Sequence, residues 1–127
     1  MDTAEYQRSI CNRLRGAETV PFVRCCIGTW EPRVAHCHEN VDHWVGSNPG
    51  HTPLRGWVTC GDSGAAVLLT PHSVVRGRDG RSFDITPLEN EKIRHSMRFV
   101  PHIGSEAEFF RYKDLFQPFL TCENPNA

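Results

Sequence analysis

The sequence predicts an α+β domain with a central antiparallel sheet and helices at one side. Two stretches in the first third of the chain carry apolar residues at helical spacing, and a third such stretch lies further on. Between them lie apolar runs of strand length, two of which are joined by the turn-forming residues Gly77-Arg78-Asp79-Gly80. Because strands joined by short turns pair antiparallel, this order of elements favours the α+β class.

The N-terminal part is expected to contain one helix and one apolar segment. Residues 2–14 are rich in helix formers, with Ile10 and Leu14 one turn apart, and Gly16 follows as a helix stop. Residues 20–28 form an apolar run bounded by proline and glycine, which predicts either a strand or a buried segment.

A second helix is expected over residues 33–44, where Cys37, Val41 and Trp44 recur at helical spacing. Glycine and proline in residues 46–50 would end it. Cys37 would then lie near the start of a helix.

The rest of the chain is expected to supply the sheet and a closing helix. The strand candidates are residues 56–60, 65–76, 81–85 and 98–102. The turn over residues 77–80 gives the strongest hairpin signal in the chain. A closing helix over residues 105–116 would place Phe109, Tyr112 and Phe116 on one face. Residues 123–127 are expected to form a frayed tail.

The chain of 127 residues, 39% of them hydrophobic, has the size of one domain and can bury about two-thirds of the surface that its unfolded form exposes. We therefore expect a single domain over residues 1–127. Its parts are an N-terminal helix and apolar segment (1–34), a core with the candidate site (35–102), and the closing helix and tail (103–127). We expect a monomer.

The charge balance gives no reason to expect a nucleic-acid or membrane partner. The 14 Lys and Arg residues nearly balance the 15 Asp and Glu residues, for a net charge of -1. No stretch approaches the roughly 20 apolar residues of a membrane span, and the N-terminus lacks a Sec-type signal. We therefore expect a cytoplasmic protein with six reduced cysteines, although export as an effector or toxin by another route fits the same sequence.

Three residues in chain order indicate nucleophilic catalysis: Cys37, His72 and Asp84. A thiol is only a few per cent ionised at neutral pH, and an imidazole held by a carboxylate is a common means of activating it. Cys37 would gain further activation from the positive end of its helix. Its backbone N–H is the natural first donor to an oxyanion, with Asn40 or the region of Trp57 as candidates for the second.

The predicted hairpin brings two of these residues together. If its ladder is centred on Arg78, His72 lies directly opposite Asp84, and directly opposed residues share a face. A register shifted by one residue would place Asp84 on the other face.

The stretch from Gly56-Trp57 through Pro71-His72-Ser73-Val74-Val75 to Asp84-Ile85-Thr86-Pro87, preceded by Cys37 and Asn40, resembles small bacterial papain-like proteins of the Cys-His-Asp type. These include NlpC/P60 enzymes, transglutaminase-like enzymes and some deamidating effectors. The resemblance covers roughly residues 35–102. It implies a minimal papain-like core in which the helix that carries the nucleophile packs on the sheet.

The resemblance also implies a thiol-dependent hydrolase that performs acyl transfer on an amide without a cofactor. The reaction would be peptide hydrolysis, glutamine deamidation or transamidation, on a peptide or protein substrate. No Gln precedes Cys37 where papain-type enzymes keep an oxyanion donor.

Two alternatives belong to other classes. The first is a zinc-binding module, because five residues of ligand type fall within sixteen positions: His36, Cys37, His38, His43 and His51. The second is a non-catalytic interaction domain that uses its aromatic C-terminal helix.

Overall fold

A computed structural model of the chain describes residues 1–124, and the last predicted tail residues, 125–127, lie outside the described part. The described residues divide into two compact units. Unit 1 contains Met1–Glu18, Arg55–Pro71 and the described residues from Met97 onward. Unit 2 contains Thr19–Leu54 and His72–Ser96.

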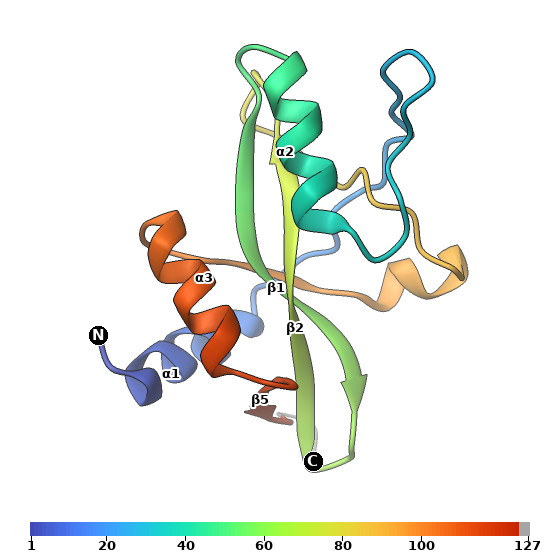
Figure 1. The fold of residues 1–127 in the computed structure, drawn as a ribbon. Helices are drawn as coiled ribbons and strands as arrows, with labels where there is room; N and C mark the ends of the chain where they lie inside the picture. The colour runs from blue at the N-terminus through green and yellow to red at the C-terminus, as the bar shows by residue number, and fades with distance from the viewer. Residues whose placement is uncertain (125–127) are drawn as a thin grey trace. The chain divides into compact units, whose positions relative to one another are not determined.

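Within residues 1–124, five strands form one antiparallel sheet, which confirms the predicted α+β class (Figure 1). The strands are β1 (Thr52–Asp62), β2 (Ala66–Arg76), β3 (Ser82–Phe83), β4 (Phe99–Pro101) and β5 (Leu120–Glu123). Four of them follow the order β3-β2-β1-β4, and β5 pairs with β2. The expectation of a frayed tail from Glu123 is wrong at its start, because β5 pairs Val67 with Cys122 and Ala66 with Glu123.

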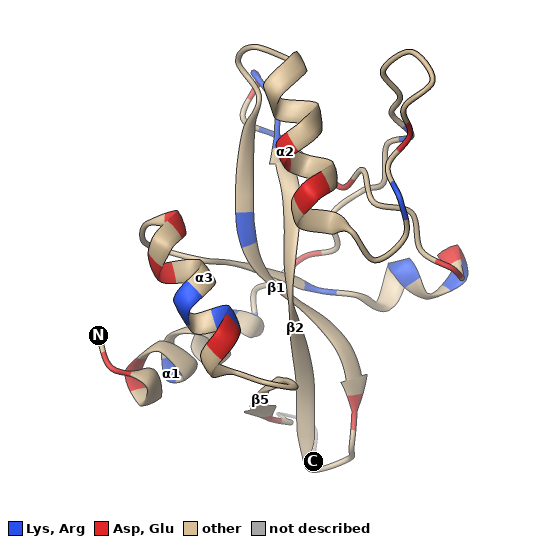
Figure 2. Ribbon diagram, viewed as in Figure 1, with Lys and Arg blue, Asp and Glu red and all other residues tan. Residues whose placement is uncertain are grey.

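Two capped helices belong to unit 1. Helix α1 (Thr3–Leu14) begins after Asp2, whose carboxylate accepts a hydrogen bond from the Glu5 N–H at 2.8 Å. Helix α3 (Glu106–Leu115) begins with a capping box formed by Ser105 and Glu108. Figure 2 shows acidic residues in its first turn, where they suit the helix dipole, and both basic and acidic residues further along.

Aromatic side chains form the core of unit 1. Tyr6 of α1 stacks on Tyr112 of α3 with ring centroids 3.7 Å apart, and both are buried. Trp57 of β1 is also buried, and its ring meets that of Phe109 edge to face. The prediction that Phe109, Tyr112 and Phe116 share one face is confirmed, since all three pack in this core.

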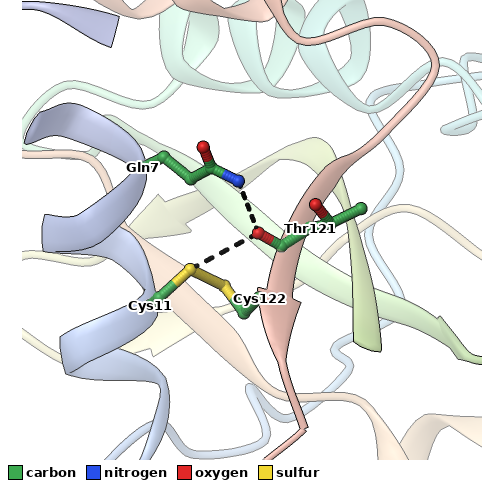
Figure 3. Close-up of a disulfide and its surroundings, with 4 residues drawn as sticks. All are labelled: Gln7, Cys11, Thr121 and Cys122. Atoms are coloured by element: carbon green, nitrogen blue, oxygen red, sulfur yellow. Dashed lines mark hydrogen bonds between the residues drawn. A yellow bond between two sulfur atoms is a disulfide. The ribbon is translucent and has the colours of Figure 1, made fainter. Parts of the chain in front are cut away.

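A disulfide links α1 to β5 within unit 1 (Figure 3). It joins Cys11 to Cys122 across 111 residues of sequence. Beside it, Gln7 Nε2 donates to the carbonyl oxygen of Thr121 at 2.7 Å. The expectation of six reduced cysteines is therefore wrong for this pair, and the remaining four are free thiols: Cys25, Cys26, Cys37 and Cys60.

Unit 2 contains helix α2 (Cys37–Ser47) and the short 3-10 helix η1 (Glu91–Ser96). Val41 of α2 packs in a buried cluster with Cys25, Val75 of β2 and Ile85. Residues 20–28 form neither the strand nor the buried segment that the sequence predicted, since only Cys25 among them is buried. They make only isolated bridges, at Phe22 with Asp84 and at Ile27 with Trp30.

The second helix begins four residues later than residue 33, where the sequence pattern starts. Ala35 has a φ of 65°, in the left-handed region, which interrupts any helix that would run through it. Cys37 is consequently the first helical residue. Within residues 1–124, no helix is both long enough and apolar enough to cross a membrane.

Candidate functional site

Cys37 occupies the first position of α2, as the sequence predicted for the start of a helix. The first N–H groups of a helix have no intrahelical acceptor and carry the positive end of the macrodipole. The side chain of the preceding His36 does not compete for them, because its ring pairs with the Glu39 carboxylate at 2.6 Å. The half-buried Cys37 thiol therefore lies where a negative charge is stabilised.

Asn40 fixes the segment that leads into Cys37. Its buried side chain accepts a hydrogen bond from the Arg33 N–H at 3.0 Å and donates to the Arg33 carbonyl at 2.8 Å and to Thr86 Oγ1 at 3.0 Å. Both amide protons are thereby used. Asn40 was a candidate oxyanion donor, and the structure gives its amide this different role.

His72 and Asp84 are in direct contact in unit 2. Their Nε2 and Oδ2 atoms lie 2.7 Å apart, and both side chains are buried. Asp84 Oδ1 also accepts a hydrogen bond from the Thr86 N–H at 3.0 Å, which fixes the plane of the carboxylate. Because Nε2 of His72 is held by Asp84, Nδ1 is the ring nitrogen left for Cys37.

The register that brings them together differs from the prediction. The observed pairs centre the ladder on Asp79 rather than Arg78: Val75 with Phe83, and Arg76 with Ser82. Moving the centre by one residue changes the partner of His72 by two positions, which preserves the face because side chains alternate along a strand. Extended beyond these pairs, this register places His72 diagonal to Asp84 rather than directly opposite it.

Two imidazoles, those of His38 and His72, interact with the Cys37 thiol. Burial alone would raise the pKa of the Cys37 thiol, but the hydrogen bonds and positive charge of these two residues outweigh it and lower the pKa to about 6. Burial would lower the pKa of His72, and the hydrogen bonds and negative charges of Asp84 and Cys37 raise it to about 10 instead. Between these two values the pair is a thiolate and an imidazolium.

Arg94 of η1 supports Asp84 and was not among the site residues that the sequence indicated. Its Nη1 donates to Asp84 Oδ2 at 3.0 Å, and its Nη2 donates to the Thr86 carbonyl at 2.9 Å. The other edge of the guanidinium pairs with Glu91, and its face lies 4.6 Å from the centre of the Phe22 ring. The Glu91 and Arg94 pair at i, i+3 was a sequence signal for a helical turn there.

His38 has a partner of its own on the neighbouring strand. Its Nδ1 lies 2.6 Å from the hydroxyl of Ser73, which is completely buried. Residues 37 and 38 of α2 thus face residues 72 and 73 of β2 through two imidazole contacts. The sequence offered His38 only as a possible metal ligand.

Trp57 belongs to the other unit. It is fully buried in unit 1, and its indole N–H donates to the Tyr6 hydroxyl at 2.9 Å. Trp57 was a candidate for the second oxyanion donor, and its single donor is used by Tyr6.

The five possible metal ligands are not gathered into one group. Among residues 1–124, no cluster of three or more His, Cys, Asp or Glu side chains is arranged to hold a metal ion. Besides the contacts of His36 and His38, the ring of His43 lies against that of Trp30, tilted by 33°, with ring centroids 4.2 Å apart. His51 Nδ1 accepts a hydrogen bond from the Trp44 indole at 3.2 Å.

The contacts within unit 2 form one continuous line: Cys37, His72, Asp84, Arg94 and Glu91. Along it, charges of opposite sign alternate when Cys37 and His72 are ionised.

Comparison of the chain with known protein families, with curated proteins and with solved structures found no match.

Proposed function

We propose that this protein is a thiol-dependent enzyme that transfers acyl groups from peptide or side-chain amides, in the manner of a minimal papain-like hydrolase. The contact of Cys37 with His72, and of His72 with Asp84, supports this proposal most strongly. A low thiol pKa beside a positively charged imidazole is what a cysteine nucleophile requires at neutral pH.

Each residue would have one role in the first half-reaction. The Cys37 thiolate attacks the carbonyl carbon, a C–S bond forms, and the C=O π pair moves onto oxygen. As this adduct collapses, the C–N bond breaks, and the His72 imidazolium gives its proton to the departing nitrogen. The products are a thioester on Cys37 and a free amine or ammonia.

The second half-reaction would restore the thiolate. Neutral His72 accepts a proton from an attacking water or amine, whose oxygen or nitrogen bonds to the thioester carbon. The C–S bond then breaks and the thiolate leaves, with imidazolium beside it. Asp84 keeps Nε2 of His72 occupied throughout, so Nδ1 carries the moving proton.

Alkylation of the thiols tests the activated pair. Wild-type protein is treated with iodoacetamide from pH 5 to 8, and labelling of each cysteine is measured by mass spectrometry. We expect Cys37 labelling to rise with a midpoint near pH 6, because the thiolate fraction increases about tenfold between pH 5 and 7 for a pKa of about 6. In His72→Ala the midpoint should move toward the value of about 8.5 of a free cysteine.

Acylation tests the reaction itself. An activated ester such as p-nitrophenyl acetate should leave an acetyl group on Cys37 of the wild type, seen as a mass increase and located by peptide mapping. The exposed thiol of Cys26 is the internal reference. Labelling of all four free thiols according to exposure alone, with no acetyl group on Cys37, would contradict the proposal. A Cys37 that reacts only after a zinc chelator is added would favour the metal-binding alternative.

A further inference from the structure

The proposed reaction places a negative charge on the substrate oxygen, and one donor for that charge is evident. The Cys37 N–H lies at the start of α2, beside the sulfur that attacks. A second donor is expected in acyl-transfer sites, since removing one of two donors lowers the rate about 10²- to 10³-fold. The two side chains that the sequence suggested, Asn40 and Trp57, donate elsewhere.

We propose that His38 supplies this second hydrogen bond through its Nε2–H, with the Ser73 hydroxyl holding the ring in place. This inference rests on the proposed function and names a further catalytic residue for the same site. His38 meets the first requirement of such a residue, because it follows Cys37 directly in the first turn of α2 and interacts electrostatically with its thiol.

The contact with Ser73 indicates which nitrogen of His38 interacts with the Cys37 sulfur. Nδ1 lies 2.6 Å from Ser73 Oγ, so Nε2 is the nitrogen left for the sulfur. A thiolate can only accept a hydrogen bond, so this Nε2 must carry the proton. Nδ1 is then the ring nitrogen that meets the Ser73 hydroxyl, which can donate or accept a hydrogen bond.

A donor that contacts the thiolate in the resting enzyme is well placed for the next step. When the sulfur bonds to the carbonyl carbon, its negative charge moves two atoms further, onto the oxygen. The Nε2–H of His38 follows this charge by a small rotation of the ring, and no proton leaves either His38 or the Cys37 N–H. His72 alone transfers a proton, to the departing nitrogen.

Two reagents separate this role from simple activation of the thiol. Acylation by p-nitrophenyl acetate passes through an oxyanion, whereas alkylation by iodoacetamide does not. Each rate at Cys37 is measured across pH, and the plateau values are compared, so that any change in the thiol pKa is removed. In His38→Ala we expect the acylation plateau to fall about 10²-fold and the alkylation plateau to stay within about threefold.

Three further variants complete the test. His38→Gln keeps an N–H donor and should recover part of the acylation rate. Ser73→Ala should slow acylation about tenfold, because the ring loses the contact that selects its tautomer. His36→Ala is the matched control, since His36 lies in the same turn but pairs with Glu39, and it should leave both plateaus unchanged.

The outcomes are distinguishable. Equal losses of acylation and alkylation in His38→Ala, or no loss of either in both His38 variants, would overturn the role of His38 while leaving the proposed function intact. A wild-type protein that is not acylated at Cys37 would overturn the proposed function and this inference with it. Thermal unfolding of each variant shows whether it is folded.

Discussion

Unit 1 and unit 2 each place a cysteine near the end of a helix, and the two cysteines have opposite chemistry. Cys11 lies in the last turns of α1, where a second sulfur from β5 meets it and removes it from reactivity. Cys37 lies at the first position of α2, where two imidazoles meet it and lower its pKa to about 6. Because both residues are cysteines, their different reactivity comes from the side chains around each sulfur and from the end of the helix at which each lies.

Among the changes that test this difference between the two cysteines, replacing Cys37 should have the largest effect. Cys37→Ser should lower acylation about 10⁴-fold or more, because a hydroxyl in the same place is not ionised beside His72. Stability should change little, since the replaced sulfur is only half-buried and the substitution changes a single atom. Acylation is followed by release of p-nitrophenol, and stability by urea denaturation. Cys26→Ser, at an exposed free thiol, should keep full activity.

Removing the disulfide should have the opposite effect: a large loss of stability and no change in the reactivity of Cys37. The double variant Cys11→Ala and Cys122→Ala should lose about 4 to 5 kcal/mol of unfolding free energy, the entropic value for a closed loop of roughly 100 residues. The midpoint of Cys37 alkylation should stay near pH 6, because Cys11 and Cys122 belong to unit 1 whereas Cys37 belongs to unit 2. Cys60→Ala is the control for loss of a thiol. A double variant that is as stable as the wild type would show that the Cys11–Cys122 disulfide does not stabilise the fold.

Replacing Arg94 tests how far the stability of unit 2 depends on its own buried charges. Arg94→Gln leaves Asp84 without one of its two cationic partners in a buried position, and we expect a loss of about 3 kcal/mol in unfolding free energy.

Asp84 would also hold His72 less firmly in this variant, so acylation at saturating substrate should fall while the alkylation plateau changes less. Arg94→Lys should recover the stability only in part, because lysine cannot form the same fork. Arg98→Gln, at an exposed arginine, is the matched control. Equal stability of Arg94→Gln and Arg98→Gln would show that the buried charge network is unimportant for folding.

The smallest expected effect lies in unit 1, at His102. Burial lowers the pKa of His102 below its usual 6.5, and its Nδ1 accepts the Tyr6 hydroxyl proton at 2.8 Å while Nε2 donates to the Ser105 carbonyl at 2.9 Å. A lowered pKa means that the unfolded chain takes up the proton first. The contribution of His102 to stability is therefore complete above pH 6.5 and is lost as pH falls through its folded pKa.

Urea denaturation of wild type and His102→Gln between pH 5 and 7.5 isolates this contribution. The wild type should lose more stability on acidification than the variant does, and His95→Gln, at an exposed histidine, should behave as the wild type. An identical pH dependence in wild type and His102→Gln would count against the proposed role of His102.

The elements that are determined by residues close together in the sequence could be predicted from it. The helices at α1, α2 and α3 and the hairpin of β2 and β3 follow from local spacing, caps and the turn at residues 77–80. The start of α2 was misplaced because the left-handed backbone of Ala35 has no signature in an alanine. Strand β5 was missed, although the burial of Leu120 and Cys122 alternates, because four residues give too short a pattern.

The site was predictable in part for the same reason. His72 and Asp84 lie on one hairpin, so pairing geometry could suggest their contact even with the wrong centre. Arg94, the Ser73 contact of His38 and the engagement of Asn40 depend on how distant segments pack. The partner of Cys11 lies 111 residues away, and six cysteines allow fifteen pairings, so spacing alone could not identify it.

The way the two units divide the chain also orders their assembly during synthesis. Every residue of unit 2 lies between Thr19 and Ser96, whereas unit 1 needs segments from both before and after that range. A ribosome therefore delivers the whole of unit 2, with Cys37, His72 and Asp84, before it delivers α3, β5 and Cys122. Cys122 is the last of the six cysteines to be synthesised, so the Cys11–Cys122 disulfide can form only after the whole of unit 2 has been synthesised.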